Sequence, residues 1–164
     1  MGARAVEFLL LTATRSGEVR GATWSEIDLR SKVWTIPAER MKAQREHRVP
    51  ISHEALRLLR SLPRFEGSDH IFTAVRGGAL SDMTLSAVFR RMGIDAVPHG
   101  LRSTFRDWAA ERTDYPHEVV EMALAHTISN QVERAYRRGD LLEKRGALMR
   151  DWARFCISSV IKRS

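Results

Sequence analysis

The chain has 164 residues, 43% of them hydrophobic, and its 27 Lys or Arg against 20 Asp or Glu leave a formal net charge of +7. This composition suits one domain with a buried core and excludes a disordered tail. The longest apolar run, residues 8–11, is far too short for a membrane span. No signal peptide opens the chain, so a cytoplasmic location is expected.

The basic charge is mostly arginine, which supplies 23 of the 27 cationic side chains and takes the sequence pI to about 10.4. Such a chain is expected to have an anionic partner, and planar guanidinium groups suit phosphate oxygens. A GC-rich genome is an alternative cause of the arginine excess. Residues 130–164 carry nine Arg or Lys against four Asp or Glu, so most of the excess lies beside Tyr136.

The first segment has apolar residues at helical spacing, which predict a helix. Residues 12–18 then indicate a helix end, a turn and the start of a second helix. Arg15 lies at this junction, and Glu18, three residues later, is its candidate partner. A simple salt bridge at a helix end is the plainer interpretation. The second helix is expected to bury Val19, Ala22 and Trp24.

Two short runs of branched and aromatic residues, 32–36 and 47–51, predict a β-hairpin. The polar, basic connection between them carries Lys42 near its tip. A lysine at a hairpin tip is usually only a solvated charge. Lysine is scarce in this chain, however, and a mobile ammonium on a hairpin can reach into a groove.

In the next forty residues the pattern predicts elements that pack in the core, and none of these residues is a candidate for catalysis or binding. Ser52 is expected to cap a helix that buries Ala55, Leu58, Leu59 and Leu62. Ile71-Phe72 suggests a short strand, and residues 76–78 a turn. Ser81 is expected to cap a further helix with Leu85, Val88, Phe89 and Met92 facing inward.

Pro98 leads into a helix on which His99 and Arg102, three residues apart, share a face that Arg106 extends. Its core-facing residues are expected to be Leu101, Phe105 and Trp108. A chain with 6 His and 23 Arg holds about one His-x-x-Arg pair by chance. The pair therefore carries no weight by itself.

Pro116 begins another helix, which ends near His126, and Ser129 or Asn130 is expected to cap the one after it. That helix would carry Tyr136 beside several arginines. A tyrosine near a helix end is usually a half-buried packing residue.

The last helix begins near Leu141 and places Leu148, Trp152 and Phe155 on one side. It is expected either to fold back on its own domain or to dock on a neighbour. Cys156 on the same segment is the only cysteine, which excludes an internal disulfide, and it is expected to pack rather than react.

Six residues taken in order resemble the catalytic signature of the tyrosine recombinase (phage integrase) family: Arg15, Lys42, His99, Arg102, His126 and Tyr136. The segments that carry the likeness are TRSGEVRGATWSEIDL, MKAQREHRVPIS, HGLRSTFRDWAAE, LAHT and AYRRGDLLEKR. They cover nearly the whole chain and are most similar to prophage and genomic-island integrases. The resemblance implies a mainly α fold with a small antiparallel β-sheet near residues 32–52.

The resemblance also implies how the site would handle DNA. Arg15 and Arg102 would bind the nonbridging oxygens of the scissile phosphate, and His126 would donate a hydrogen bond to it. No metal ion or cofactor is implied, because the two arginines take the place of a metal.

The other three residues would carry the covalent chemistry. Tyr136 would attack the phosphate and form a 3′-phosphotyrosyl link, while Lys42 would protonate the departing 5′ oxygen. His99 would assist proton movement at the tyrosine. Tyr115 is the only other tyrosine, and it lies outside the segments that match.

The implied partners are double-stranded DNA and further copies of the chain, assembled as a tetramer through the C-terminal helix. Leu148, Trp152 and Phe155 are the candidate contacts. No membrane and no small-molecule substrate are expected.

Two departures from the family pattern are visible. Ala13 stands where the family commonly has glycine, so a local backbone adjustment is expected. Nothing in residues 1–164 corresponds to a core-binding or arm-binding domain, so the chain is expected to be an isolated catalytic domain. Two alternatives stay open: a type IB topoisomerase activity, and a DNA-binding remnant of an integrase without catalysis.

Overall fold

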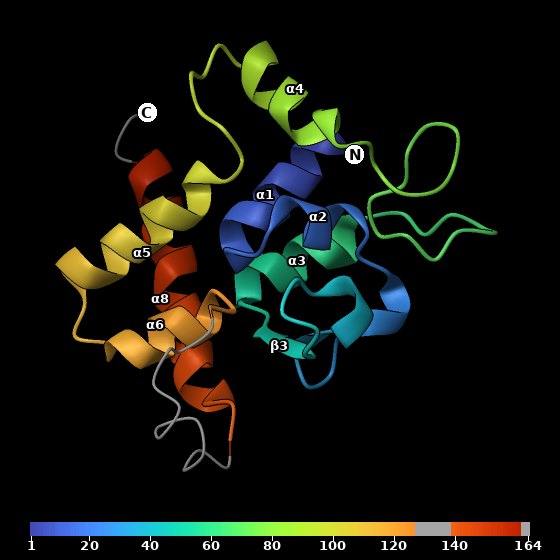
Figure 1. Ribbon diagram of the computed structural model, residues 1–164. Coiled ribbons are helices and arrows are strands. Elements are labelled where there is room, and N and C mark those ends of the chain that lie inside the picture. Colours follow the sequence, from blue (N-terminus) through green and yellow to red (C-terminus); the bar gives the residue numbers. More distant parts are fainter. Residues whose placement is uncertain (127–138, 162–164) are drawn as a thin grey trace.

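The computed structural model describes residues 1–126 and 139–161, the last three of these for the backbone alone (Figure 1). The helices are α1 (Gly2–Thr12), α2 (Ser16–Arg20), α3 (His53–Ser61), α4 (Met83–Arg91), α5 (Gly100–Arg112), α6 (His117–Ala123) and α8 (Leu142–Ile161). The strands β1 (Ile27–Asp28), β2 (Val33–Ile36) and β3 (His47–Pro50) form one antiparallel sheet in that order. The mainly α fold class with a small antiparallel sheet is therefore confirmed.

Helix α1 lies at the centre of the first core. Its buried face carries Phe8, whose ring lies 5.3 Å from the ring of Trp34 on β2 and 5.5 Å from that of Phe72. The helix ends at Thr12. The next residue, Ala13, is left-handed at φ 51°, and the chain turns at once into α2. The predicted helix, turn and second helix are confirmed.

Helix α2 is shorter than the predicted second helix. It ends at Arg20, and Trp24 begins a separate 3-10 turn over Trp24–Glu26. The carbonyl of Glu18 accepts a 2.6 Å hydrogen bond from the Arg40 guanidinium, so a side chain takes up a carbonyl that a longer helix would use. Val19, Ala22 and Trp24 are nonetheless buried.

The hairpin is confirmed, with Ile36 opposite His47 and Val33 opposite Pro50. Strand β1 joins it as an additional edge that was not predicted. The expectation of a strand at Ile71-Phe72 is wrong. Both side chains are fully buried, but the backbone around them forms only isolated bridges, so their hydrophobicity reflects burial without a ladder.

The cap predictions had mixed outcomes. Ser52 caps α3, where its hydroxyl accepts from the Ala55 amide at 3.2 Å. The prediction for Ser81 is wrong: Asp82 precedes α4, and the Ser81 hydroxyl hydrogen-bonds instead to the Thr84 hydroxyl at 2.9 Å. Met92 is also not inward, since it lies just past the end of α4 and is 62% exposed.

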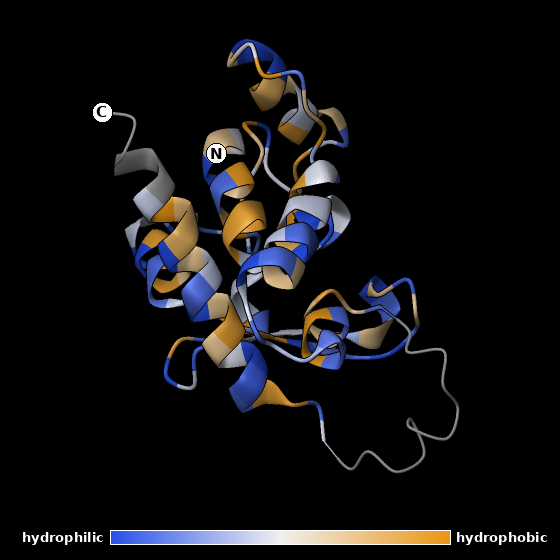
Figure 2. Cartoon of the chain, turned by 90° about the vertical axis from the view of Figure 1, so that its left-hand side faces the viewer, coloured by the Kyte–Doolittle hydropathy of each residue, from blue (hydrophilic) through white to orange (hydrophobic). Residues whose placement is uncertain are grey.

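A second core forms where α5, α6 and α8 meet. The Trp152 ring of α8 contacts the rings of Phe105, Trp108 and Phe155, and its indole N–H donates to the Leu10 carbonyl at 2.7 Å. Figure 2 shows hydrophobic and hydrophilic residues on the same helices, as expected of amphipathic helices around a core. No helix in the described part of the chain is long and apolar enough to cross a membrane.

Helix α8 therefore folds back on its own domain (Figure 1). Leu148 is 0% and Trp152 1% exposed within this chain, and their contact with a neighbouring copy stays a prediction. Phe155 is half-buried and packs on Trp108 and Trp152. Cys156 packs against the same core, and burial raises the pKa of its thiol to about 12, which agrees with the predicted packing role.

Helix α8 is also tied to the hairpin by a buried cation. Arg145, only 1% exposed, donates to the Arg48 carbonyl of β3 at 2.5 Å and to the Asp140 carbonyl at 2.7 Å. Its guanidinium also pairs with the Asp140 carboxylate at 3.0 Å. Because a buried cation is costly unless it is paired, these contacts hold the start of α8 at a defined place beside β3.

We expect Trp152→Ala to lower the free energy of unfolding by roughly 3–5 kcal/mol, because it removes a buried ring and leaves a cavity. Urea denaturation followed by circular dichroism measures this change. Ile157→Ala, at a 36% exposed position on the same helix, serves as the control and should cost far less. Equal losses in the two variants would contradict the structural account of α8.

Candidate active site

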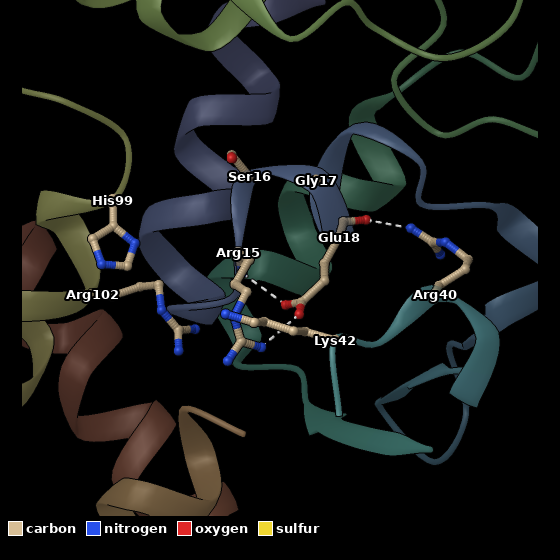
Figure 3. Close-up of a pocket in the computed structure, with 8 residues that line it drawn as sticks. All are labelled: Arg15, Ser16, Gly17, Glu18, Arg40, Lys42, His99 and Arg102. Carbon is tan, nitrogen blue, oxygen red and sulfur yellow. Dashed lines mark hydrogen bonds and ion pairs between the residues drawn. The ribbon is translucent and has the colours of Figure 1, made fainter. Parts of the chain in front are cut away.

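A pocket of about 320 Å³ opens where the start of α2, the hairpin connection and the start of α5 meet (Figure 3). Its lining residues are Arg15, Ser16, Gly17, Glu18, Arg40, Lys42, His99 and Arg102. Four of the six residues singled out in the sequence thus face one space, although they come from three separate segments.

Arg15 is held at the residue that precedes α2. Its backbone amide donates to the Glu18 carboxylate at 2.7 Å and its guanidinium pairs with the same carboxylate at 2.9 Å. A third contact, at 3.4 Å, reaches the carbonyl of Ala125. The predicted partnership with Glu18 is confirmed. The side chain keeps 29% of its surface exposed, on the pocket side.

Arg102 is buried deeper, at 4% exposure, in the first turn of α5. Its guanidinium donates to the Ala13 carbonyl at 2.7 Å and to the Leu124 carbonyl at 2.6 Å. Burial, and then the charge of Arg15, lower the pKa of Arg102 to about 10. The group remains a cation at neutral pH, but one whose desolvation favours binding of an anion.

Three consecutive carbonyls at the end of α6 receive donors from remote parts of the chain. The ring of His47 donates to Ala123, while Arg102 donates to Leu124 and Arg15 to Ala125. The last carbonyls of a helix have no partner within the helix and carry partial negative charge. The end of α6 therefore fixes the hairpin, α5 and the start of α2 relative to one another.

His126 follows this helix end. Ala125 is left-handed at φ 50°, and the resulting turn lets the His126 amide donate back to the Glu121 carbonyl at 3.0 Å. The imidazole Nδ1 lies 2.8 Å from Oε2 of Glu121, and Nε2 lies 3.1 Å from the Arg102 guanidinium. His126 thus joins the arginines as the fifth of the six predicted residues.

Lys42 and His99 complete the rim of the pocket. Both side chains are exposed, and Figure 3 shows Lys42 extended toward Arg15 and His99 beside Arg102. Lys42 forms no ion pair with any residue in the described ranges. Tyr136, Ser129, Asn130 and Val132 lie outside the described residues, so the position of the expected nucleophile and of its helix stays a prediction.

Ala13 occupies the position where glycine is common in the family. It keeps the left-handed conformation that glycine adopts at no steric cost, and its side chain is buried. In this conformation its carbonyl accepts the Arg102 hydrogen bond. The left-handed conformation of Ala13 thus helps to position the arginine.

Three further residues shape the site and were not picked out from the sequence. Arg40 lines the pocket, pairs with Glu26 and donates to the Glu18 carbonyl. Glu121 holds the ring of His126, and His47 bonds the end of α6. Of these three residues, only Arg40 could have been suspected from the sequence, because it lies two residues before Lys42. Glu121 is five residues from His126, a spacing that no regular helix face brings together.

Tyr115, the other tyrosine, forms a hydrogen bond away from the pocket. Its hydroxyl donates to the Asp151 carboxylate at 2.7 Å, and desolvation together with that bond raises the pKa of the phenol to about 12. A phenol that titrates so high is a poor nucleophile at neutral pH. In residues 1–126 and 139–161, no group of three or more His, Cys, Asp or Glu could hold a metal ion.

We expect acid to weaken the fold through His47. Burial first, and then the charges of Arg145, Arg15 and Arg102, lower the pKa of this histidine from 6.5 to about 4. Between these pH values the unfolded chain binds a proton that the folded chain does not. Stability present above pH 6.5 is therefore lost as the pH falls toward 4, by up to roughly 3 kcal/mol.

The variant His47→Asn keeps a donor for the Ala123 carbonyl but does not titrate. Urea denaturation at a series of pH values from 7 to 4.5 should therefore show a smaller loss of stability in the variant than in the native chain. Identical pH dependence in the two proteins would refute the assignment.

Known proteins resemble this chain in both sequence and structure. Residues 2–141 match the phage integrase family. Prophage integrase IntA of Escherichia coli K12 is 41% identical over 149 residues, which covers 88% of this chain and 36% of that protein. The chain thus spans about a third of the length of that relative.

Solved structures share the fold at low sequence identity. The integrase from mycobacterium phage Brujita superposes with a TM-score of 0.69 at 19% identity, over 91% of this chain and 50% of that one. A lambda integrase tetramer bound to a Holliday junction gives a TM-score of 0.58 at 22% identity, over 79% of this chain and 42% of that one. The family match over most of the sequence, together with this shared fold, shows that the chain belongs to the phage integrase family.

Proposed function

We propose that this chain is the catalytic domain of a site-specific DNA recombinase that cuts and rejoins DNA without a metal ion. The convergence of Arg15, Arg102 and His126 beside one pocket is the observation that carries the proposal. Membership of the phage integrase family supports it. Three cationic or hydrogen-bonding groups at one point suit a phosphate that gains negative charge during the reaction.

The two arginines divide the binding of the phosphate between them. Arg102 uses part of its guanidinium on the Ala13 and Leu124 carbonyls, and Arg15 uses part on Glu18. A guanidinium has five N–H donors, so each arginine keeps donors for the nonbridging oxygens. Because protein contacts already hold both groups, little reorganisation is required when the pentacoordinate phosphorus forms.

The covalent step balances without an outside reagent. The Tyr136 oxygen bonds to phosphorus as the bond from phosphorus to the 5′ oxygen breaks. The phenol proton passes toward His99, and Lys42 supplies a proton to the departing 5′ oxygen. The 3′-phosphotyrosyl link retains the energy of the phosphodiester, so a 5′-hydroxyl from the same or another strand can reverse the step without ATP.

The partners we propose are double-stranded DNA and further copies of the chain, in a tetramer like that of lambda integrase on a Holliday junction. The C-terminal helix, with Leu148, Trp152 and Phe155 as candidate contacts, is the part of the chain that we propose to reach a neighbouring copy. A bacterial chromosome as substrate would place the reaction in the cytoplasm.

A nicked suicide DNA substrate tests the nucleophile. We expect the native chain to form a covalent protein–DNA adduct in the presence of EDTA, and Tyr136→Phe to abolish it because the attacking oxygen is absent. Denaturing gel electrophoresis measures the adduct. Tyr115→Phe is the matched control, and it should retain adduct formation because that hydroxyl is bound to Asp151.

An adduct that survives in Tyr136→Phe would contradict the assignment of the nucleophile. No adduct in the native chain on DNA that carries its own recombination site would favour a non-catalytic DNA-binding role. Relaxation of a supercoiled plasmid without strand exchange between paired sites would favour a topoisomerase.

Arg102→Lys tests the buried phosphate ligand. A lysine cannot donate to the Ala13 and Leu124 carbonyls with a planar fork and still face the phosphate, so we expect a loss of roughly 10²–10³-fold in the cleavage rate. Single-turnover cleavage of the suicide substrate measures it. Arg154→Lys, on the exposed side of α8, is the control, and a similar loss in both variants would argue against a specific role for Arg102.

A further inference from the structure

Glu121 is an acidic residue at the edge of a cationic site. Its side chain is 14% exposed, and its Oε2 lies 2.8 Å from Nδ1 of His126. The other oxygen pairs with Nε of Arg106 at 2.9 Å and lies 3.6 Å from Nε2 of His117. The carboxylate is thus held between α5 and α6 and faces one ring nitrogen of His126.

The contact restricts the proton on His126. An ionised carboxylate only accepts hydrogen bonds, so Nδ1 of His126 must carry a proton to bond Glu121. When the ring is neutral, Nε2 then accepts a hydrogen bond from the Arg102 guanidinium, 3.1 Å away. When the ring is charged, Nε2 carries a proton that Arg102, which has no acceptor, cannot bind. A donor at Nε2 is what a phosphate oxygen in this place requires.

The backbone adds to this restraint. The His126 amide donates to the Glu121 carbonyl at 3.0 Å, so the same residue holds both the main chain and the ring of His126. Arg106 in turn pairs with the carboxylate at 2.9 Å and holds it close to α5. Among the described residues, Glu121 and Arg102 contact the ring itself. Arg106 and His117 contact Glu121, and Arg15 contacts the Ala125 carbonyl beside His126.

We propose that Glu121 is a positioning residue: it holds the His126 ring with Nδ1 protonated, so that Nε2 faces the scissile phosphate and can bind it as part of an imidazolium. This inference rests on the proposed function. The arrangement resembles other carboxylate–histidine pairs, in which the acid fixes the tautomer and orientation of a ring that contacts the reacting group.

A double-mutant cycle tests whether Glu121 acts through His126. Glu121→Ala should lower single-turnover cleavage roughly 10–100-fold in the native background. In the background of His126→Ala the same change should cost less than about twofold, because the ring it positions is gone. Glu111→Ala, an exposed acid on α5, is the control and should leave the rate unchanged.

An equal loss in both backgrounds would overturn the proposal, since it would indicate a purely structural role for Glu121. No loss in the native background would overturn it as well. Thermal unfolding checks that the variants fold, and where Glu121→Ala does not, Glu121→Gln keeps a side chain of the same shape for the same cycle.

A direct readout comes from ¹⁵N NMR of the histidine rings without DNA. In the native chain, the Nδ1 signal of His126 should be that of a protonated nitrogen. In Glu121→Gln it should shift as the other tautomer becomes populated, because an amide can also donate to Nδ1. Unchanged ring signals would overturn the proposal.

The two proposals fail in different ways. If the native chain forms no adduct that depends on Tyr136, the proposed function fails, while the NMR comparison still reports whether Glu121 sets the proton on His126. If the adduct forms at the same rate with and without Glu121, only the positioning role fails.

Discussion

The guanidinium of Arg102 connects the ends of two helices beside the candidate site. One of its nitrogens donates to the carbonyl of Ala13, where α1 ends, and the other to Leu124, where α6 ends. A buried cation without partners would cost several kcal/mol, so the two helix ends and α5 must keep this arrangement for the fold to be stable. The geometry of the site is thus a consequence of how the helices are joined.

Two carboxylates beside the cations of the site offset part of its positive charge. Glu18 partners Arg15 and Glu121 partners His126, and both carboxylates are largely buried. These acids offset part of the repulsion between cations that lie near one another, and both raise the pKa of Arg102 against the effect of burial. The pocket side keeps Lys42 and the exposed part of Arg15, and so remains positive toward a phosphate.

Local patterns in the sequence were sufficient for most elements. Apolar spacing predicted α1, and the branched run at residues 32–36 predicted the hairpin, because periodicity reflects burial within one element. The patterns gave wrong predictions where contacts with other segments of the chain decided the local structure. Ile71 and Phe72 are buried in the same core as α1, and Arg40, from a remote part of the chain, binds the Glu18 carbonyl where α2 ends.

The sequence by itself determined the identity and order of the candidate residues, since Arg15, Lys42, His99, Arg102, His126 and Tyr136 follow one family's pattern along the chain. Only the tertiary structure decided which of them meet, how Arg102 is held, and that α8 folds onto its own domain. It also added Glu121 and His47. The contacts of Arg102, Glu121 and His47 join residues that are far apart in the sequence or that lie across the irregular end of α6. Several of these contacts are with backbone carbonyls, and the spacing of side chains in a sequence does not predict such partners.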